Sequence, residues 1–87
     1  MKVENIIGKN GKVVKNQFVI TDDNEKTFQS YNTIIAKKDI KGNLILDINH
    51  WCYSKTTSKY RNIFTELTTK ETKEQIESGL IRLENLN

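Results

Sequence analysis

The sequence has 87 residues, of which 36% are hydrophobic and 29% charged, and its 14 basic and 11 acidic side chains give a net charge of +3. A chain of this length forms a single small domain, residues 1–87, and is too short for two lobes with a catalytic cleft between them. One cysteine and one histidine exclude an internal disulfide and a zinc site built from four Cys and His ligands.

A glycine-containing turn predicts a β-hairpin at the start of the chain. Gly8 and Gly11 separate residues 2–7 from residues 12–21, and both flanks carry β-branched or aromatic side chains. The polar run at 22–25 predicts the next turn, because Asp and Asn side chains bond readily to nearby backbone amides.

Two further extended segments follow the polar run. Residues 26–38 form one long stretch with β-type composition, and the turn at 39–43 leads into Leu44–Ile48. Leu44, Leu46 and Ile48 alternate with other side chains, which is the period of a half-buried strand. We therefore expect about four antiparallel strands in meander order within residues 2–49.

The pattern changes to helical spacing after residue 53. Tyr60, Phe64 and Leu67 recur at intervals of three and four residues, which predicts a helix ending near Leu67. Ser54 is suited to cap its first turn.

A second helix is predicted from its end signals. Thr68 and Glu71 have the spacing of a capping box, and Gly79 ends the helix after Ser78. Residues 80–83 return to β-type composition, so we expect a short last strand or an extended tail that returns to the sheet edge. The predicted fold class is α+β, an antiparallel sheet followed by two short helices.

The apolar residues of these elements predict the core. We expect these side chains to be mostly buried: Phe18, Ile20, Ile34, Leu44, Leu46, Tyr60, Phe64 and Ile76.

Residues 49–61 combine aromatic, hydroxyl and basic side chains, and they contain three basic residues and no acidic one. Aromatic rings interleaved with Lys and Arg are typical of proteins that stack bases and neutralise a phosphate backbone. The candidate binding residues are Trp51, Tyr53, Lys55, Thr56, Thr57, Lys59 and Arg61. The interpretation that we favour for this segment is structural: the rings belong to the core and the hydroxyls cap a helix.

No residue set predicts catalysis, a metal or a cofactor. His50 and Cys52 lack a third group that would orient a base and a thiol. Asp22, Asp23 and Glu25 lack the ligand spacing of a calcium loop, so a solvated turn is favoured. No apolar run reaches the length of a membrane span and no signal peptide is visible, which predicts a cytoplasmic protein.

One string of residues carries a family resemblance. Tyr53-Ser54-x-Thr56-Thr57-x-x-Tyr60-Arg61-Asn62, together with the segments at 28–36 and 72–87, resembles a family of short uncharacterised proteins from phages and plasmids of low-GC Gram-positive bacteria. The resemblance covers about residues 18–87. It implies an origin on a mobile genetic element and supplies no catalytic residues.

The resemblance and the absence of a catalytic set lead to two hypotheses for function. The first is a non-enzymatic, stoichiometric inhibitor of a host defence complex, similar to an anti-CRISPR protein, whose partner is a host or CRISPR effector protein in the host cytoplasm. The second is a nucleic-acid-binding accessory protein that uses residues 49–61. The two differ in their salt response, because only binding to phosphates weakens steeply as the salt concentration rises.

Overall fold

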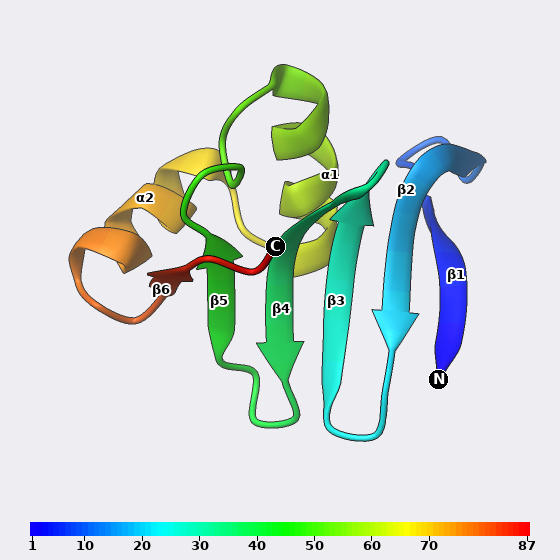
Figure 1. Cartoon of the computed structure of the whole chain (residues 1–87). Helices are drawn as coiled ribbons and strands as arrows, with labels where there is room; N and C mark the ends of the chain where they lie inside the picture. Colours follow the sequence, from blue (N-terminus) through cyan, green and yellow to red (C-terminus); the bar gives the residue numbers. More distant parts are fainter.

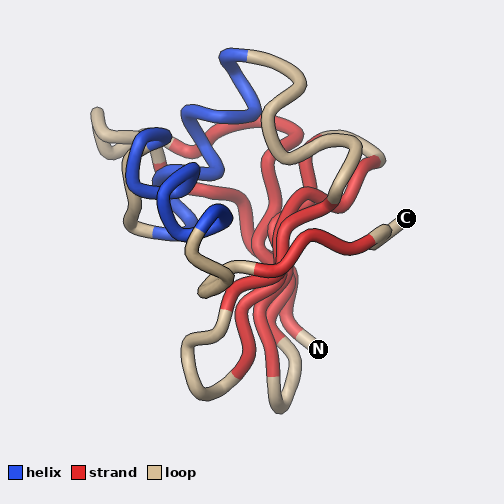
Figure 2. Tube along the Cα trace, turned by 90° about the vertical axis from the view of Figure 1, so that its left-hand side faces the viewer, coloured by secondary structure: helices blue, strands red, loops and turns tan.

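A six-stranded sheet forms one layer of the molecule and two helices cover one of its faces, as the computed structural model of residues 1–87 shows (Figure 1, Figure 2). The elements are β1 (Lys2–Ile7), β2 (Val13–Thr21), β3 (Glu25–Ser30), β4 (Thr33–Asp39), β5 (Leu44–Asp47), α1 (Lys55–Thr65), α2 (Thr69–Glu77) and β6 (Arg82–Glu84). The first five strands form an antiparallel meander in chain order. The two helices then connect β5 to β6, which lies parallel to β5 at the sheet edge.

The sheet has six strands, where the sequence predicted about four and a short last strand. The stretch 26–38 is two strands, because a turn at Tyr31 and Asn32 reverses the chain and pairs Ser30 with Thr33. Tyr31 adopts a φ of 54°, in the left-handed region that bulky residues seldom occupy. Asn is common in turns, but a single Asn beside a tyrosine in the left-handed conformation is a weak turn signal, and the sequence analysis did not predict this turn. The last strand is β6, and it returns to the sheet edge as expected.

Both helices begin at their predicted caps. The Ser54 hydroxyl accepts a hydrogen bond from the Thr57 amide at 3.0 Å at the start of α1. At the start of α2, Thr68 and Glu71 form the complete capping box, with bonds of 3.1 and 3.0 Å. These local bonds satisfy amides that have no partner within the helix, which is why the sequence alone located both starts.

The core lies between the helices and one face of the sheet. Phe28, Ala36 and Leu46 occupy neighbouring positions in the strand register and are fully buried. Phe64 of α1 stacks on Phe28 with ring centroids 5.9 Å apart. The complete set of buried hydrophobic side chains is Ile6, Phe28, Ile35, Ala36, Leu44, Leu46, Phe64 and Ile81.

Five of the eight predicted core residues are only partly buried. Tyr60 and Ile76 pack against the rim of the core. Phe18, Ile20 and Ile34 lie on the opposite face of the sheet, since the register places Phe18 beside Gln29 and Gln29 beside Ile34. No helix covers this open face (Figure 2). The sequence could not separate the two faces, because both carry apolar residues at period two.

Removing the Phe64 ring tests the core. The side chain is 8% exposed, so Phe64→Ala should lower the free energy of unfolding by about 3–5 kcal/mol. Urea unfolding followed by circular dichroism measures this loss. The matched control is Phe18→Ala on the open face, which should cost clearly less. A loss below about 1 kcal/mol at Phe64 would contradict this docking of α1.

Asp47, at the end of β5, bonds to the turn that follows it and to the distant C-terminal tail. Its carboxylate is fully buried and accepts bonds from the Asn49 amide at 3.1 Å, His50 Nδ1 at 2.6 Å and the Leu86 amide at 2.8 Å. Burial alone would raise the pKa of Asp47, but the bonds from Leu86, His50, Asn87 and Asn49 hold the pKa below its ordinary value of 3.8. Asp47 therefore fixes both the turn after β5 and the C-terminal tail.

A pH-dependent contribution to stability follows from the lowered pKa of Asp47. The contribution is fully present above the unfolded pKa and is lost as the pH falls through the folded pKa. Asp47→Asn should therefore be less stable than the parent by about 1–3 kcal/mol at pH 7, with a difference that shrinks below about pH 4. Urea unfolding across this pH range measures both effects. The exposed control Asp23→Asn should change the stability by less than about 0.5 kcal/mol, and a similar loss in the two variants would contradict the role of Asp47.

Candidate functional site

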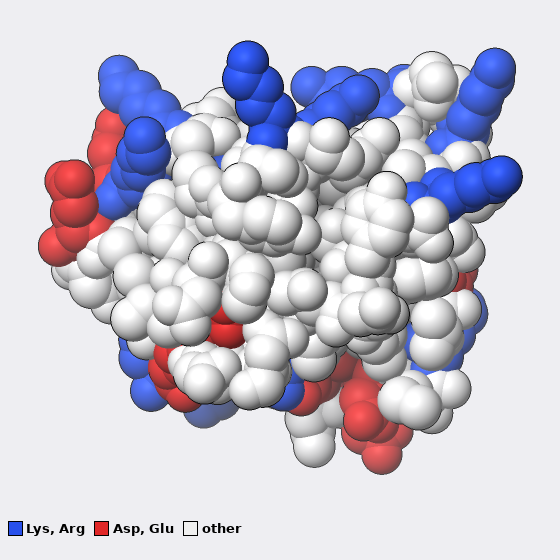
Figure 3. All heavy atoms as spheres, turned by 45° about the horizontal axis from the view of Figure 1, so that its top comes forward, with Lys and Arg blue, Asp and Glu red and all other residues white.

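The two ends of the sheet differ in the charged residues that they carry. The β1–β2 turn and the start of α1 lie at one end, and the β2–β3 and β4–β5 turns at the other (Figure 1). Lys9 of the first turn and Lys59 of α1 line a common depression, together with Glu66 and Glu71. The space-filling view shows most of its Lys and Arg side chains along the upper border, above a broad surface with few charges (Figure 3).

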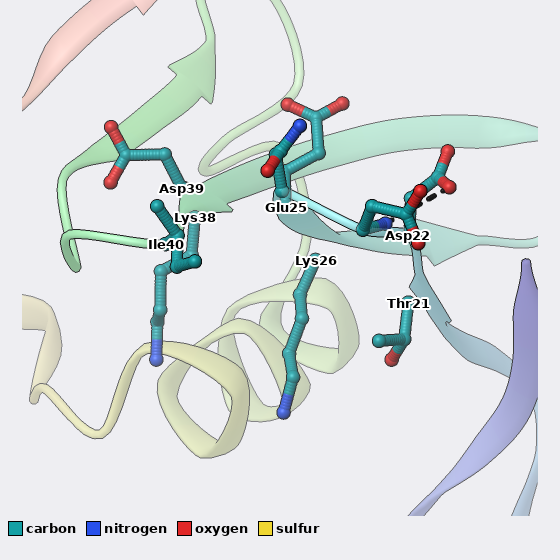
Figure 4. A pocket seen from close by; sticks show the side chains of 9 residues that line it. Thr21, Asp22, Glu25, Lys26, Lys38, Asp39 and Ile40 are labelled. Carbon is teal, nitrogen blue, oxygen red and sulfur yellow. Dashed lines mark hydrogen bonds between the residues drawn. The ribbon is translucent and has the colours of Figure 1, made fainter.

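The acidic end holds a pocket of about 370 Å³ between two hairpin turns. The carboxylates of Asp22, Glu25 and Asp39 point to one side of this pocket, whereas Lys26 and Lys38 point to the other (Figure 4). No group of three or more His, Cys, Asp and Glu side chains in the structure is arranged to hold a metal ion.

A second pocket, on α1, is lined by basic and neutral polar side chains and contains no carboxylate. It is open to solvent and has a volume of about 650 Å³. Its lining residues are Cys52, Ser54, Lys55, Ser58, Lys59, Asn62 and Thr69. We call it the α1 pocket. A concave surface with two ammonium groups and no acid attracts anions.

The helical repeat of α1 brings most of this lining together. Lys55, Ser58, Lys59 and Asn62 are spaced by three and four residues, so they share the outward face of α1. Thr69 is the first residue of α2, and the short connection between the helices carries it to the same face. The α1 pocket is therefore a product of both helices.

Arg61 lies beneath the α1 pocket and is completely buried. Its guanidinium donates to the Trp51 carbonyl and, at 3.4, 2.9 and 3.1 Å, to side-chain oxygens of Ser58, Asn62 and Thr69. The guanidinium carbon also lies 5.3 Å from the Trp51 ring, a cation–π contact. Nε has no hydrogen-bond partner.

The charge of Arg61 has no acidic partner. None of the four ion pairs in the structure includes Arg61, and every group that accepts a bond from it is neutral. Burial lowers the pKa of Arg61 and the neighbouring Cys52 side chain opposes this effect, yet an arginine keeps its proton in proteins. A positive charge is therefore held in a poorly solvated position under a surface that is itself basic. An anion in the α1 pocket would be stabilised by all three cationic side chains.

A protein-family match covers every residue of this site. The model of a family of unknown function (DUF8033) matches residues 1–79. The chain belongs to this family. The match covers β1 through α2 and so includes the α1 pocket and Arg61, while β6 and the tail lie beyond it. The resemblance read from the sequence began at about residue 18, but the family match also includes the first hairpin. No curated protein and no solved structure matches the chain.

The seven predicted binding residues fall in three different places in this family member. Lys55 and Lys59 line the α1 pocket. Arg61 is buried beneath it, Trp51 covers Arg61, and Thr57 is buried in the cap of α1. Trp51 and Thr57 thus have surroundings of the kind that the core-and-cap interpretation described, whereas that interpretation did not predict the burial of Arg61. Tyr53 and Thr56 are exposed but lie outside the pocket lining.

Sequence reasoning missed five lining residues. Ser58 and Asn62 follow from the helical spacing of Lys55, and Ser54 had been recognised only as a cap. Cys52 had been considered only as a thiol partner of His50; in the structure its sulfur accepts a bond from Ser58 at 3.9 Å, while His50 bonds to Asp47. Thr69 had no signal in the sequence, because only the packing of α2 brings it to the pocket.

No helix in the structure combines the length and the apolar character that a membrane crossing requires.

Proposed function

We propose that the chain is a non-enzymatic binding protein of a mobile genetic element, and that it contacts nucleic acid through the basic face of α1. The observation that carries this proposal is the α1 pocket, which has two lysines, no carboxylate and the buried charge of Arg61 beneath it. Lys and hydroxyl side chains at a helix surface supply the phosphate contacts that position proteins on nucleic acids.

Two neighbouring features extend this surface. Lys9, Lys12 and Lys15 of the first hairpin add positive charge at the same end of the sheet. Tyr53 is 51% exposed beside the start of α1, and an exposed ring is suited to stacking on an unpaired base. The combination favours a single strand, whose phosphates and bases are both accessible.

Neutralising the two pocket lysines tests the proposal. Lys55→Ala with Lys59→Ala should weaken binding of a single-stranded oligonucleotide, and the slope of log K against log salt should fall by about two. Fluorescence anisotropy at several salt concentrations measures both changes. The unfolding temperature should stay nearly unchanged, because exposed lysines contribute little to stability.

The matched control removes the same charge from the other end of the sheet. Lys26 and Lys41 are exposed near the β2–β3 and β4–β5 turns, so Lys26→Ala with Lys41→Ala lowers the net charge equally. This variant should keep most of the affinity. Equal losses in the two double variants would mean that net charge alone attracts the oligonucleotide, and would contradict a defined site on α1.

Inhibition of a host defence complex is the second candidate function. The open face of the sheet favours it, because Val3 is 57% exposed there and Phe18, Ile20 and Ile45 are partly exposed. Protein partners bury such side chains at the centre of an interface. An inhibitor of this kind should co-purify with a host or CRISPR effector protein, and the complex should survive the loss of Lys55 and Lys59 at physiological salt.

Replacing the single thiol tests the non-enzymatic part of the proposal. Cys52→Ser should keep oligonucleotide affinity within about twofold, because the proposed contacts are electrostatic and do not involve the thiol. The same anisotropy assay measures this affinity. An abolished interaction in a variant with an unchanged circular dichroism spectrum would contradict a purely non-covalent mechanism.

A further inference from the structure

The three side chains that accept bonds from the Arg61 guanidinium all line the α1 pocket. Ser58, Asn62 and Thr69 each direct an oxygen toward Arg61 and belong to the lining. A guanidinium offers only donors in a fixed planar arrangement. Arg61 therefore uses acceptor atoms of the pocket lining from the buried side. These bonds determine which polar atoms of the lining remain free to bind a ligand from the solvent side.

The groups of Asn62 and Thr69 that remain free are donors. The Thr69 hydroxyl oxygen accepts bonds from Arg61 at 3.1 Å and from the Asn62 amide at 3.3 Å, which uses both of its acceptor sites. Its O–H is left to donate, and the structure gives it no acceptor within the protein. The Asn62 oxygen is bound to Arg61, so its NH₂ group retains one free N–H after bonding Thr69. Together with two ammonium groups, the α1 pocket presents donors to an incoming ligand.

We propose that the α1 pocket binds a phosphate group, with Asn62, Thr69, Lys55 and Lys59 as donors and Arg61 as the positioning residue that orients Asn62 and Thr69. An ionised phosphate has several acceptor oxygens and matches a lining of donors without carboxylates. This inference rests on the proposed function, in which the phosphate belongs to a nucleic acid. The group is either a terminal phosphomonoester or an internal phosphodiester, which share this chemistry.

The variant Asn62→Asp should change phosphate binding without lowering the stability of the fold. The introduced carboxylate would replace an oxygen that lies 2.9 Å from the guanidinium, so it would pair with Arg61 and preserve the fold. It would also remove the free N–H and add a negative charge to the pocket. We expect an unchanged or higher unfolding temperature and about tenfold or greater loss of affinity for a 5′-phosphorylated single-stranded oligonucleotide.

A hydroxyl comparison provides the matched control. Thr69→Val removes the proposed donor at nearly constant volume, whereas Thr56→Val removes an exposed hydroxyl of α1 outside the pocket. Only the change at Thr69 should weaken binding. A 5′-hydroxyl oligonucleotide of the same sequence identifies the phosphate: tighter binding of the phosphorylated strand assigns a terminal group, and equal binding assigns an internal one.

A separate NMR measurement tests whether Arg61 orients Asn62 for phosphate binding. Inorganic phosphate should shift the side-chain amide resonances of Asn62 in proton–nitrogen NMR spectra of the parent. Arg61→Lys keeps the charge but lacks the planar fork, so this shift should disappear while the dispersed backbone spectrum shows an intact fold. A phosphate shift that persists in a folded Arg61→Lys variant would overturn the role of Arg61.

The outcomes distinguish the pocket from the wider function. Unchanged affinity in both Asn62→Asp and Thr69→Val would overturn the phosphate pocket, and a loss in the Lys55 and Lys59 double variant would then still support nucleic-acid binding. If inorganic phosphate shifts the Asn62 resonances of the parent protein but the protein binds neither oligonucleotide, the phosphate-binding pocket is supported. The proposal of nucleic-acid binding would then be overturned.

Discussion

The buried guanidinium of Arg61 is the interaction on which the helical layer depends. It bonds to the loop before α1 through Trp51, to α1 itself through Ser58 and Asn62, and to the start of α2 through Thr69. Leaving the donors of a buried charge without partners is costly, and these four groups accept bonds from both terminal nitrogens of the guanidinium, so their positions are constrained together. The same requirement shapes the pocket above, because the atoms that satisfy Arg61 are lining atoms of the α1 pocket.

The single-layer sheet explains why the protein has two different free surfaces. Helices cover only one face, so α1 has one side packed on Phe28 through Phe64 and one side free for polar chemistry. The other face of the sheet stays open and carries partly exposed apolar side chains (Figure 2). Asp47 and Asn87 bind the tail across this arrangement: Asp47 holds the Leu86 amide, and the Asn87 side chain bonds to both backbone groups of Ile34. The tail thereby satisfies strand groups of β4 that would otherwise lack a partner.

The electrostatic character of the site arises from the fold rather than from the net charge. A total of +3 is small, but the hairpin turns that carry Asp22, Glu25 and Asp39 lie at one end of the sheet and α1 begins at the other. Separation of this kind lets one end attract anions although the whole molecule is only slightly basic. The family match contains both ends together with Arg61, so the separated charges and the buried guanidinium lie within one family unit.

The sequence by itself determined the local features of this protein. The α+β class, the caps at Ser54 and Thr68, and the alternation at Leu44–Leu46 were all readable, because each depends on residues at most a few positions apart. Lys55 and Lys59 were found for the same reason, since one helical turn joins them. Tertiary structure decided the turn at Tyr31, the faces of the sheet, the burial of Arg61 and the arrival of Thr69 beside Asn62. These features depend on which segments pack together, and packing is a property of the whole chain that no local spacing encodes.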